Sequence, residues 1–287
     1  MDHIEKQQAK AGAGKPGLRD VVYGAAVGDA LGVPYEFRGR GSFTCTGMSS
    51  GGAHNQPVGT FSDDTSMLLA TCDSIRMKGR IDVDDMRERF NAWVLRGEYA
   101  VNRLVFDVGG TVSAALAAGM GRSDIRSNGN GSLMRIAPLA FTDASDDEVR
   151  AVSAITHGHA ISTESCVCFV GLLRGLIAGE SWEEALARSI PAGEEFAFLR
   201  DVASRPASEV RGTGFVLDTL GASIWCLANT DSYAECVRAA VNLGDDTDTT
   251  ACVAGALAGA VYGYDAIPAE WIEVLRGKDI IDSCLFA

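Results

Sequence analysis

The chain has 287 residues, a formal net charge of −13 and a mean hydropathy of +0.08, so it is long enough to bury one large hydrophobic core. The negative charge, without any run of lysine and arginine, argues against binding along a nucleic-acid backbone. No apolar run approaches the roughly 20 residues needed to cross a bilayer, so no membrane segment is expected. Residues 1–17 are polar and lack an apolar signal core, which predicts a flexible tail before a single domain at 18–287.

Apolar residues recur at helical spacing along the chain, and no alternating β-branched run is present. The pattern predicts an all-α protein of about a dozen helices. A short helix interrupted by Pro138 is also expected. The longer helices are expected at residues 18–31, 63–79, 82–96, 114–120, 146–155, 161–178, 182–190, 194–203, 215–228, 233–241 and 246–262.

The eight cysteines lie mostly inside these apolar helical patterns and form no CxxC pair. This usage is typical of reduced core residues in a cytoplasmic protein rather than of a disulfide framework or a thiolate metal site.

Two acidic stretches each precede a helical pattern. Residues 242–250 read Asn-Leu-Gly-Asp-Asp-Thr-Asp-Thr-Thr, and residues 59–66 read Gly-Thr-Phe-Ser-Asp-Asp-Thr-Ser. One or two such residues suffice to cap a helix, but three carboxylates within four positions repel one another unless a cation lies between them. Facing each other, the two stretches could hold two ions in an all-oxygen cage, which favours magnesium, manganese or calcium. The proposed ligands are Ser62, Asp63, Asp64, Asp246, Asp248 and Thr249.

Further candidates lie in the connections, and each has a simpler alternative. Glu36 follows a helix end and could be a solvated acid, whereas Asp107 could cap the next helix. In the Gly/Ser-rich loop at 38–58, His54 is interpreted as a solvated side chain. The two Asn-Gly steps at 128–131 favour a loop that presents N–H groups to an anion, the alternative being a simple turn. His157 and His159, without further His or Cys nearby, make a poor metal site; one of them is expected to be a hydrogen-bonding group in a cleft, or else a buried structural residue.

Taken together and in this order, the motifs at residues 28–32, 62–65, 128–135, 156–157 and 244–249 resemble those of the ADP-ribosylglycohydrolase family, over roughly residues 18–271. The resemblance implies a compact orthogonal multi-helix bundle with a dinuclear metal cleft holding magnesium or manganese. It also implies an enzyme that removes ADP-ribose from a modified protein side chain, with arginine the favoured linkage. Serine-linked or small ADP-ribosyl compounds, a two-metal phosphoesterase and a non-catalytic ADP-ribose-binding protein remain alternatives.

The resemblance also assigns roles to individual positions. The six cage residues match the family's metal ligands, Glu36 matches an acid near the metals, and Asp107 matches an acid beside the scissile bond in relatives that act on arginine. Asp63 and Asp64 are counted with these acids as catalytic candidates. The positions that match substrate contacts are Ser127, Asn128, Asn130, Gly131 and Ser132 for the diphosphate, His157, and Phe215 for adenine.

Three positions depart from the family pattern. Ser62 stands where many members have threonine, Gly110 replaces a common asparagine, and Phe215 stands where tyrosine is expected. Ser62 keeps the hydroxyl ligand, and Phe215 loses a hydroxyl but keeps a stacking face for adenine. The departures are therefore expected to affect substrate preference more than catalysis. The expected partners are ADP-ribose and an ADP-ribosylated protein, and the chain itself is expected to be a monomer.

Overall fold

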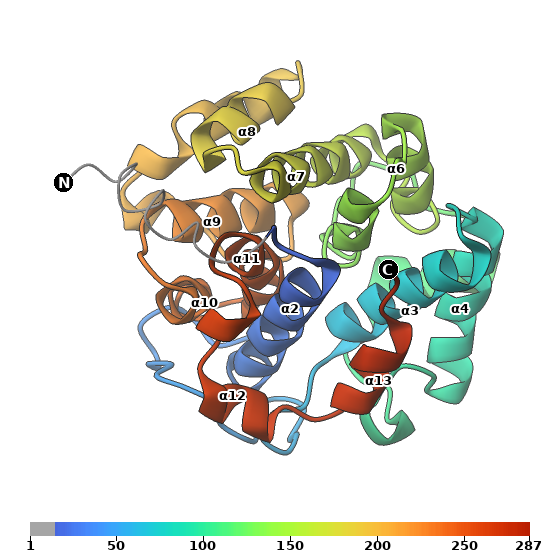
Figure 1. The fold of residues 1–287 in the computed structure, drawn as a ribbon, viewed down its shortest axis with the longest axis horizontal. Coiled ribbons are helices and arrows are strands. Elements are labelled where there is room, and N and C mark those ends of the chain that lie inside the picture. Colours follow the sequence, from blue (N-terminus) through green and yellow to red (C-terminus); the bar gives the residue numbers. More distant parts are fainter. Residues whose placement is uncertain (1–14) are drawn as a thin grey trace.

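Helices build the protein, and residues 15–287, which this computed structural model describes, contain no β-strand (Figure 1). The all-α prediction is therefore confirmed. The α-helices are α2 (Leu18–Gly32), α3 (Asp63–Lys78), α4 (Val83–Arg96), α5 (Gly110–Ala118), α6 (Asp146–Ser153), α7 (Ala160–Ala178), α8 (Trp182–Ser189), α9 (Val216–Ala228), α10 (Tyr233–Asn242), α11 (Thr247–Tyr262), α12 (Ala269–Val274) and α13 (Lys278–Cys284). Residues 1–14 of the expected tail lie outside the described residues, so that expectation stays a prediction.

Short 3₁₀ helices fill several connections. They are η1 (Val33–Tyr35), η2 (Val101–Arg103), η3 (Ala137–Phe141), η4 (Glu194–Arg200), η5 (Val202–Ser204), η6 (Ala207–Glu209) and η7 (Tyr264–Ala266).

Most of the predicted helices are present, and the exceptions have local causes. The helix expected at 194–203 is wrong, because η4 and η5 occupy this segment; Phe196 and Leu199 are both buried, and 3₁₀ geometry places residues three apart on one face. No helix is interrupted by Pro138, since this residue lies in the first turn of η3, where its missing N–H is tolerated. Helix α5 begins at Gly110 rather than at residue 114, and α12 and α13 were not predicted.

Helices α2 and α11 pair along the middle of the molecule and form its most extensive helix contact (Figure 1). Their backbones touch: a Cβ atom added at Gly28 would lie 2.0 Å from the Ala251 carbonyl oxygen, and one added at Gly255 would lie 2.2 Å from the Gly24 oxygen. The C-terminal end of α2 meets the first turn of α11, where Thr247 Oγ1 donates a hydrogen bond to the Gly32 oxygen at 2.8 Å. Helices α9 and α10 pack on α11, while α3 contacts α2 and α11 and pairs with α4.

The length and apolar character of α7 contradict the expectation that no apolar run is long enough to cross a bilayer. The helix has 19 residues and is long and apolar enough to span a bilayer by length and composition, so the statement that no run approaches this length is wrong. About two thirds of its most apolar window is buried in the protein, where α7 packs against α6, α8 and α9.

All eight cysteines are buried and none forms a disulfide, as predicted for core residues.

Candidate active site

The first acidic stretch begins α3. Ser62 is its N-cap: its hydroxyl accepts from the Asp64 N–H at 3.3 Å and donates to Asp64 Oδ2 at 2.9 Å. Asp29, from the last turn of α2, accepts from the backbone N–H groups of Ser62 and Thr65 and from the Thr65 hydroxyl. This fully buried carboxylate therefore fixes where α3 begins relative to α2, and with it the positions of Asp63 and Asp64.

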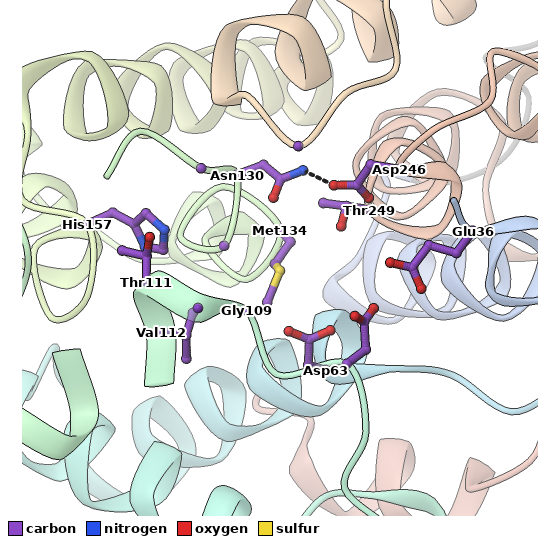
Figure 2. Close-up of a pocket in the computed structure, with 15 residues that line it drawn as sticks. Glu36, Asp63, Gly109, Thr111, Val112, Asn130, Met134, His157, Asp246 and Thr249 are labelled. Carbon is purple, nitrogen blue, oxygen red and sulfur yellow. Dashed lines mark hydrogen bonds between the residues drawn. The ribbon is translucent and has the colours of Figure 1, made fainter. Parts of the chain in front are cut away.

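The second acidic stretch begins α11, after Gly244 and Asp245 with φ values of 80° and 62°. After this left-handed turn Asp245 is exposed, Asp246 is partly buried and lines the pocket, and Asp248 is fully buried. Asp246 occupies the N-cap position, but its side chain makes no capping hydrogen bond; instead, Oδ2 accepts from Asn130 Nδ2 at 2.9 Å (Figure 2). Helix capping therefore does not account for this carboxylate.

The two acidic stretches meet, although about 180 residues separate them in the chain. Thr249 Oγ1 lies 3.3 Å from Asp64 Oδ2 and donates to it. Carboxylate oxygens of Asp29, Asp64 and Asp248 lie within 4.8 Å of one another, in a group that could hold a metal ion. The convergence expected from the sequence is thus present.

The electrostatics of this cluster favour a cation. Burial, followed by the charges of neighbouring carboxylates, raises the pKa values of Asp63, Asp64 and Asp248 well above their ordinary range. Asp64 Oδ1, Asp246 Oδ1 and Asp248 Oδ2 are buried and have no hydrogen-bond partner among residues 15–287. Buried acceptors without donors are costly, and a hard cation with oxygen ligands would satisfy all three. The residues present therefore fit a divalent metal ion.

Glu36, His54 and Asp107 form a second cluster. Backbone hydrogen bonds join Phe37 and Arg38 to Asp245, which places Glu36 beside the start of α11. Burial, and then the charges of Asp107 and Asp246, raise the pKa of Glu36 to about 9. His54 Nε2 lies 2.5 Å from Glu36 Oε2 and 3.7 Å from Asp107 Oδ1.

This cluster decides three alternatives left open by the sequence. Glu36 is only 5% exposed, so it is not a solvated acid. Asp107 does not cap α5, because the N-cap there is Gly109. The interpretation of His54 as a solvated side chain is wrong: the side chain is 17% exposed and packs between the rings of Phe37 and Phe106.

The Asn-Gly loop is held against the segment that precedes α9. Asn130 N–H donates to the Gly214 oxygen and Val216 N–H donates to the Asn128 oxygen. Among the predicted substrate contacts, Asn130, Gly131 and His157 line the pocket. The side chains of the other loop residues are engaged elsewhere, Ser127 with Asp124, Asn128 with Ile125 and Ser162, and Ser132 with Ser153. Phe215 does not line the pocket, but its ring is 40% exposed beside it, next to Gly214.

Some of these groups line one pocket with a volume of about 190 Å³. Of the predicted metal ligands, Asp63, Asp246 and Thr249 line it, whereas Ser62, Asp64 and Asp248 are buried and are not part of its lining. Figure 2 shows His157 and Thr111 across this pocket from Glu36, with Asp63, Asp246 and Thr249 on the acidic side. Helix α5 begins at the pocket with Gly109 and Gly110, and no side chain caps it. One wall therefore carries carboxylates and the other carries backbone N–H groups and an imidazole.

Several pocket residues were not assigned from the sequence. They are the start of α5 (Gly109, Gly110, Thr111 and Val112), Met134 and Gly214. Asp29, which anchors the start of α3, was also not assigned. The Gly-Gly pair before a helical pattern and the Asp within the motif at 28–32 were the available signals. Met134 lies within the motif at 128–135, which was a signal of the same kind, whereas for Gly214 the sequence offers none.

Comparisons with known proteins agree with this geometry. The family model for ADP-ribosylglycohydrolase matches residues 17–286. The ADP-ribosylarginine hydrolase Tri1 of Serratia proteamaculans is 33% identical over 283 residues, which covers 92% of this chain and 76% of that protein. The ADP-ribosyl-[dinitrogen reductase] glycohydrolase of Rhodospirillum rubrum is 31% identical over 286 residues and 92% of each chain. A solved ADP-ribosylglycohydrolase-related protein complex matches with a TM-score of 0.77 and 31% identity, over 98% of this chain and 96% of the other. With its motifs, fold and acidic pocket in agreement with these matches, the chain belongs to the ADP-ribosylglycohydrolase family.

Proposed function

We propose that this protein hydrolyses the bond between the anomeric carbon of ADP-ribose and an arginine side chain of a modified protein. The observation that carries the proposal is the meeting of two acidic helix starts in one pocket, joined by the Thr249–Asp64 hydrogen bond. The arginine linkage is favoured because two relatives, from Serratia proteamaculans and Pseudomonas putida, are ADP-ribosylarginine hydrolases.

The cation site consists of side chains from both helix starts, and its all-oxygen chemistry suits two magnesium or manganese ions. When bound, such ions supply a hold on the ribose hydroxyls and a lowered pKa for water. Asp29 anchors the start of α3 and keeps its carboxylates facing those of α11. The residues that would hold the ions are Ser62, Asp63, Asp64, Asp246, Asp248 and Thr249.

Glu36 and Asp107 handle the protons of the reaction. Oxygen from water bonds to the anomeric carbon as the carbon–nitrogen bond breaks, and the electron pair of that bond goes to the departing guanidine nitrogen. One carboxyl accepts the proton that water loses, and the other returns a proton to the departing nitrogen. His54 lies between them and keeps both side chains facing the pocket. The products are free ADP-ribose and an unmodified arginine.

Substrate orientation follows from the two walls of the pocket. The ribose that is cut lies toward the carboxylates, and the diphosphate lies toward the start of α5, the Asn-Gly loop and His157. Backbone N–H groups at a helix start favour an anion, and a carboxylate-lined wall repels one. The exposed ring of Phe215 is available to stack on adenine.

Incubation with arginine-linked and serine-linked ADP-ribosylated proteins, in magnesium or in manganese, tests the proposal. The expected product is free ADP-ribose from the arginine-linked protein. Asp246→Ala is expected to abolish both metal binding and release, whereas Asp147→Ala, which changes an acid whose side chain is 93% exposed, is the matched control. Release of AMP or inorganic phosphate would instead indicate a phosphoesterase, and full activity of Asp246→Ala would contradict the assigned site.

A further inference from the structure

Arg135 is a buried guanidinium that forms no ion pair with a carboxylate among residues 15–287. Its side chain has no solvent exposure, and it lies over the ring of Phe90 with 4.6 Å between the guanidinium carbon and the ring centroid. Its two terminal nitrogens donate to the Gly131 carbonyl oxygen and to Thr156 Oγ1, each at 2.7 Å. Burial lowers the pKa of Arg135 to about 10, so it remains protonated at neutral pH. A charge buried at this cost is expected to have a defined task.

The hydrogen bond from Arg135 to Thr156 determines which nitrogen of His157 carries the proton. A guanidinium can only donate, so Thr156 Oγ1 must accept from Arg135, and its own single proton needs a different acceptor. His157 Nδ1 lies 2.8 Å from Thr156 Oγ1 and is the acceptor available among the described residues. In a neutral imidazole whose Nδ1 accepts, Nε2 carries the hydrogen.

The charged form of His157 is disfavoured in this position. Burial, and then the positive charge of Arg135, lower the pKa of His157 to about 3, so the ring is neutral near pH 7. The hydrogen-bond chain and the electrostatics thus agree on one protonation state, with a single N–H on Nε2.

The ring of His157 faces the wall of the pocket opposite the carboxylates (Figure 2). On the same wall lie Gly131, whose carbonyl oxygen Arg135 binds, and the uncapped start of α5. An N–H of His157 would lie on the same side of the pocket as the free backbone N–H groups of α5. Hydrogen-bond donors grouped in this way favour an anionic oxygen as their ligand. Because the ring is neutral, it does not attract the carboxylates across the pocket, which stay available to bind cations.

We propose that Arg135 and Thr156 are positioning residues that hold His157 as its Nε2–H tautomer, which donates a hydrogen bond to a phosphate oxygen of ADP-ribose. The choice of ligand rests on the proposed function, whereas the tautomer depends only on the hydrogen bonds within the protein.

Nitrogen NMR of the free protein tests the tautomer directly. In long-range ¹H–¹⁵N spectra of the full chain near pH 7, His157 Nδ1 is expected at the shift of an unprotonated ring nitrogen and Nε2 at that of an N–H. A His157→Gln variant identifies its signals among those of the four histidines. A protonated Nδ1, or a doubly protonated ring, in the wild-type protein would overturn the proposal.

Two variants of Thr156 test the positioning role. Thr156→Ser keeps the hydroxyl and is expected to keep both the tautomer and the affinity for ADP-ribose in magnesium, measured by calorimetry. Thr156→Val removes the hydroxyl; it is expected to shift His157 toward Nδ1–H and to weaken ADP-ribose binding about tenfold, since a hydrogen bond to a charged group contributes at least this much. Thr71→Val, which removes another fully buried threonine hydroxyl away from the pocket, controls for the loss of a buried hydroxyl alone.

The outcomes separate the two proposals. Unchanged affinity and tautomer in a folded Thr156→Val variant would refute the positioning role. A wild-type protein with the Nε2–H tautomer that binds no ADP-ribose would contradict the proposed function and the phosphate as ligand, but not the hydrogen-bond chain.

Discussion

Replacing Asp248 by asparagine is expected to stabilise the protein without metal and destabilise it with metal. Carboxylate oxygens of Asp29, Asp64 and Asp248 lie within 4.8 Å of one another, and two unit charges at this distance repel by about 3 kcal/mol at an effective dielectric constant near 20. Asparagine removes this repulsion and keeps the Oδ1 acceptor that binds the Thr249 N–H at 3.0 Å. Because protonation already relieves part of the repulsion, we expect the metal-free variant to gain about 1–3 kcal/mol of unfolding free energy.

Bound metal reverses this order. A ligand present at about 1,000 times its dissociation constant stabilises the folded state by about 4.1 kcal/mol, which exceeds the gain of about 1–3 kcal/mol expected for the metal-free variant. The wild-type protein should gain this stability and the variant should lose most of it, so that the melting temperatures of the two proteins change order between EDTA and magnesium. Asp147→Asn, an exposed acid on α6, should behave as the wild type in both.

The pH dependence of the metal-free protein has a definite sign. The pKa of Asp248 is raised in the folded state, so the folded protein holds its proton at pH values where the unfolded chain has lost it. The contribution of Asp248 to stability is therefore full below about pH 4, the ordinary carboxyl pKa, and decreases as the pH rises toward neutrality. Thermal unfolding from pH 4 to pH 8 in EDTA should show a smaller loss of stability for Asp248→Asn than for the wild type.

An equal metal-induced rise in melting temperature for variant and wild type would refute the assignment of Asp248 to the metal site.

Three further changes test other parts of the molecule. Asp107→Asn should lower kcat for release from arginine-linked substrate about 100-fold or more while calorimetry shows nearly unchanged ADP-ribose binding, and an unchanged kcat would remove Asp107 from the proton-handling pair. His54→Ala should lower kcat about tenfold with little change in KM, because it would hold the two acids rather than bind substrate; a rise in KM alone would contradict this role. Gly28→Ala should cost about 1–3 kcal/mol or more in urea unfolding, since its Cβ would lie 2.0 Å from the Ala251 carbonyl oxygen, whereas Gly39→Ala, with no atom within 4 Å of the added Cβ, should cost little. Equal stabilities of these two glycine variants would contradict the close approach.

The acids on α3 and α11 could be predicted because the signal is local. Each stretch places carboxylates and hydroxyls next to one another in the chain, and mutual repulsion then requires a shared partner. Most helices followed from apolar spacing for the same reason. The resemblance added Glu36, Asp107 and His157 at positions where composition alone allowed simpler interpretations.

His54 and Asp29 could not be assigned in this way. His54 lies in an aperiodic loop, and its contact with Glu36 depends on a bridge between Gly51 and Gln56 that no sequence period encodes. Asp29 lies inside an apolar helix, where its partners on α3 follow only from helix packing. The role of the start of α5 was missed because backbone N–H groups are common to nearly all residue types, so the sequence does not show which of them face a pocket.

The contact between α2 and α11 has a consequence for how this scaffold can change. Asp29 lies on α2 and Asp248 on α11. At Gly24, Gly28, Gly255 and Gly259 the backbone of one helix faces a carbonyl oxygen of the other with no room for a side chain, so backbone contact sets the spacing of these helices. The geometry of the ion-binding residues is therefore rigid, and it changes little when side chains elsewhere in the interior repack. Loops 38–58 and 98–110 carry His54 and Asp107 beside these helices. New linkage preferences are therefore expected to arise by replacement of these loops, while the pairing of α2 and α11 is unchanged.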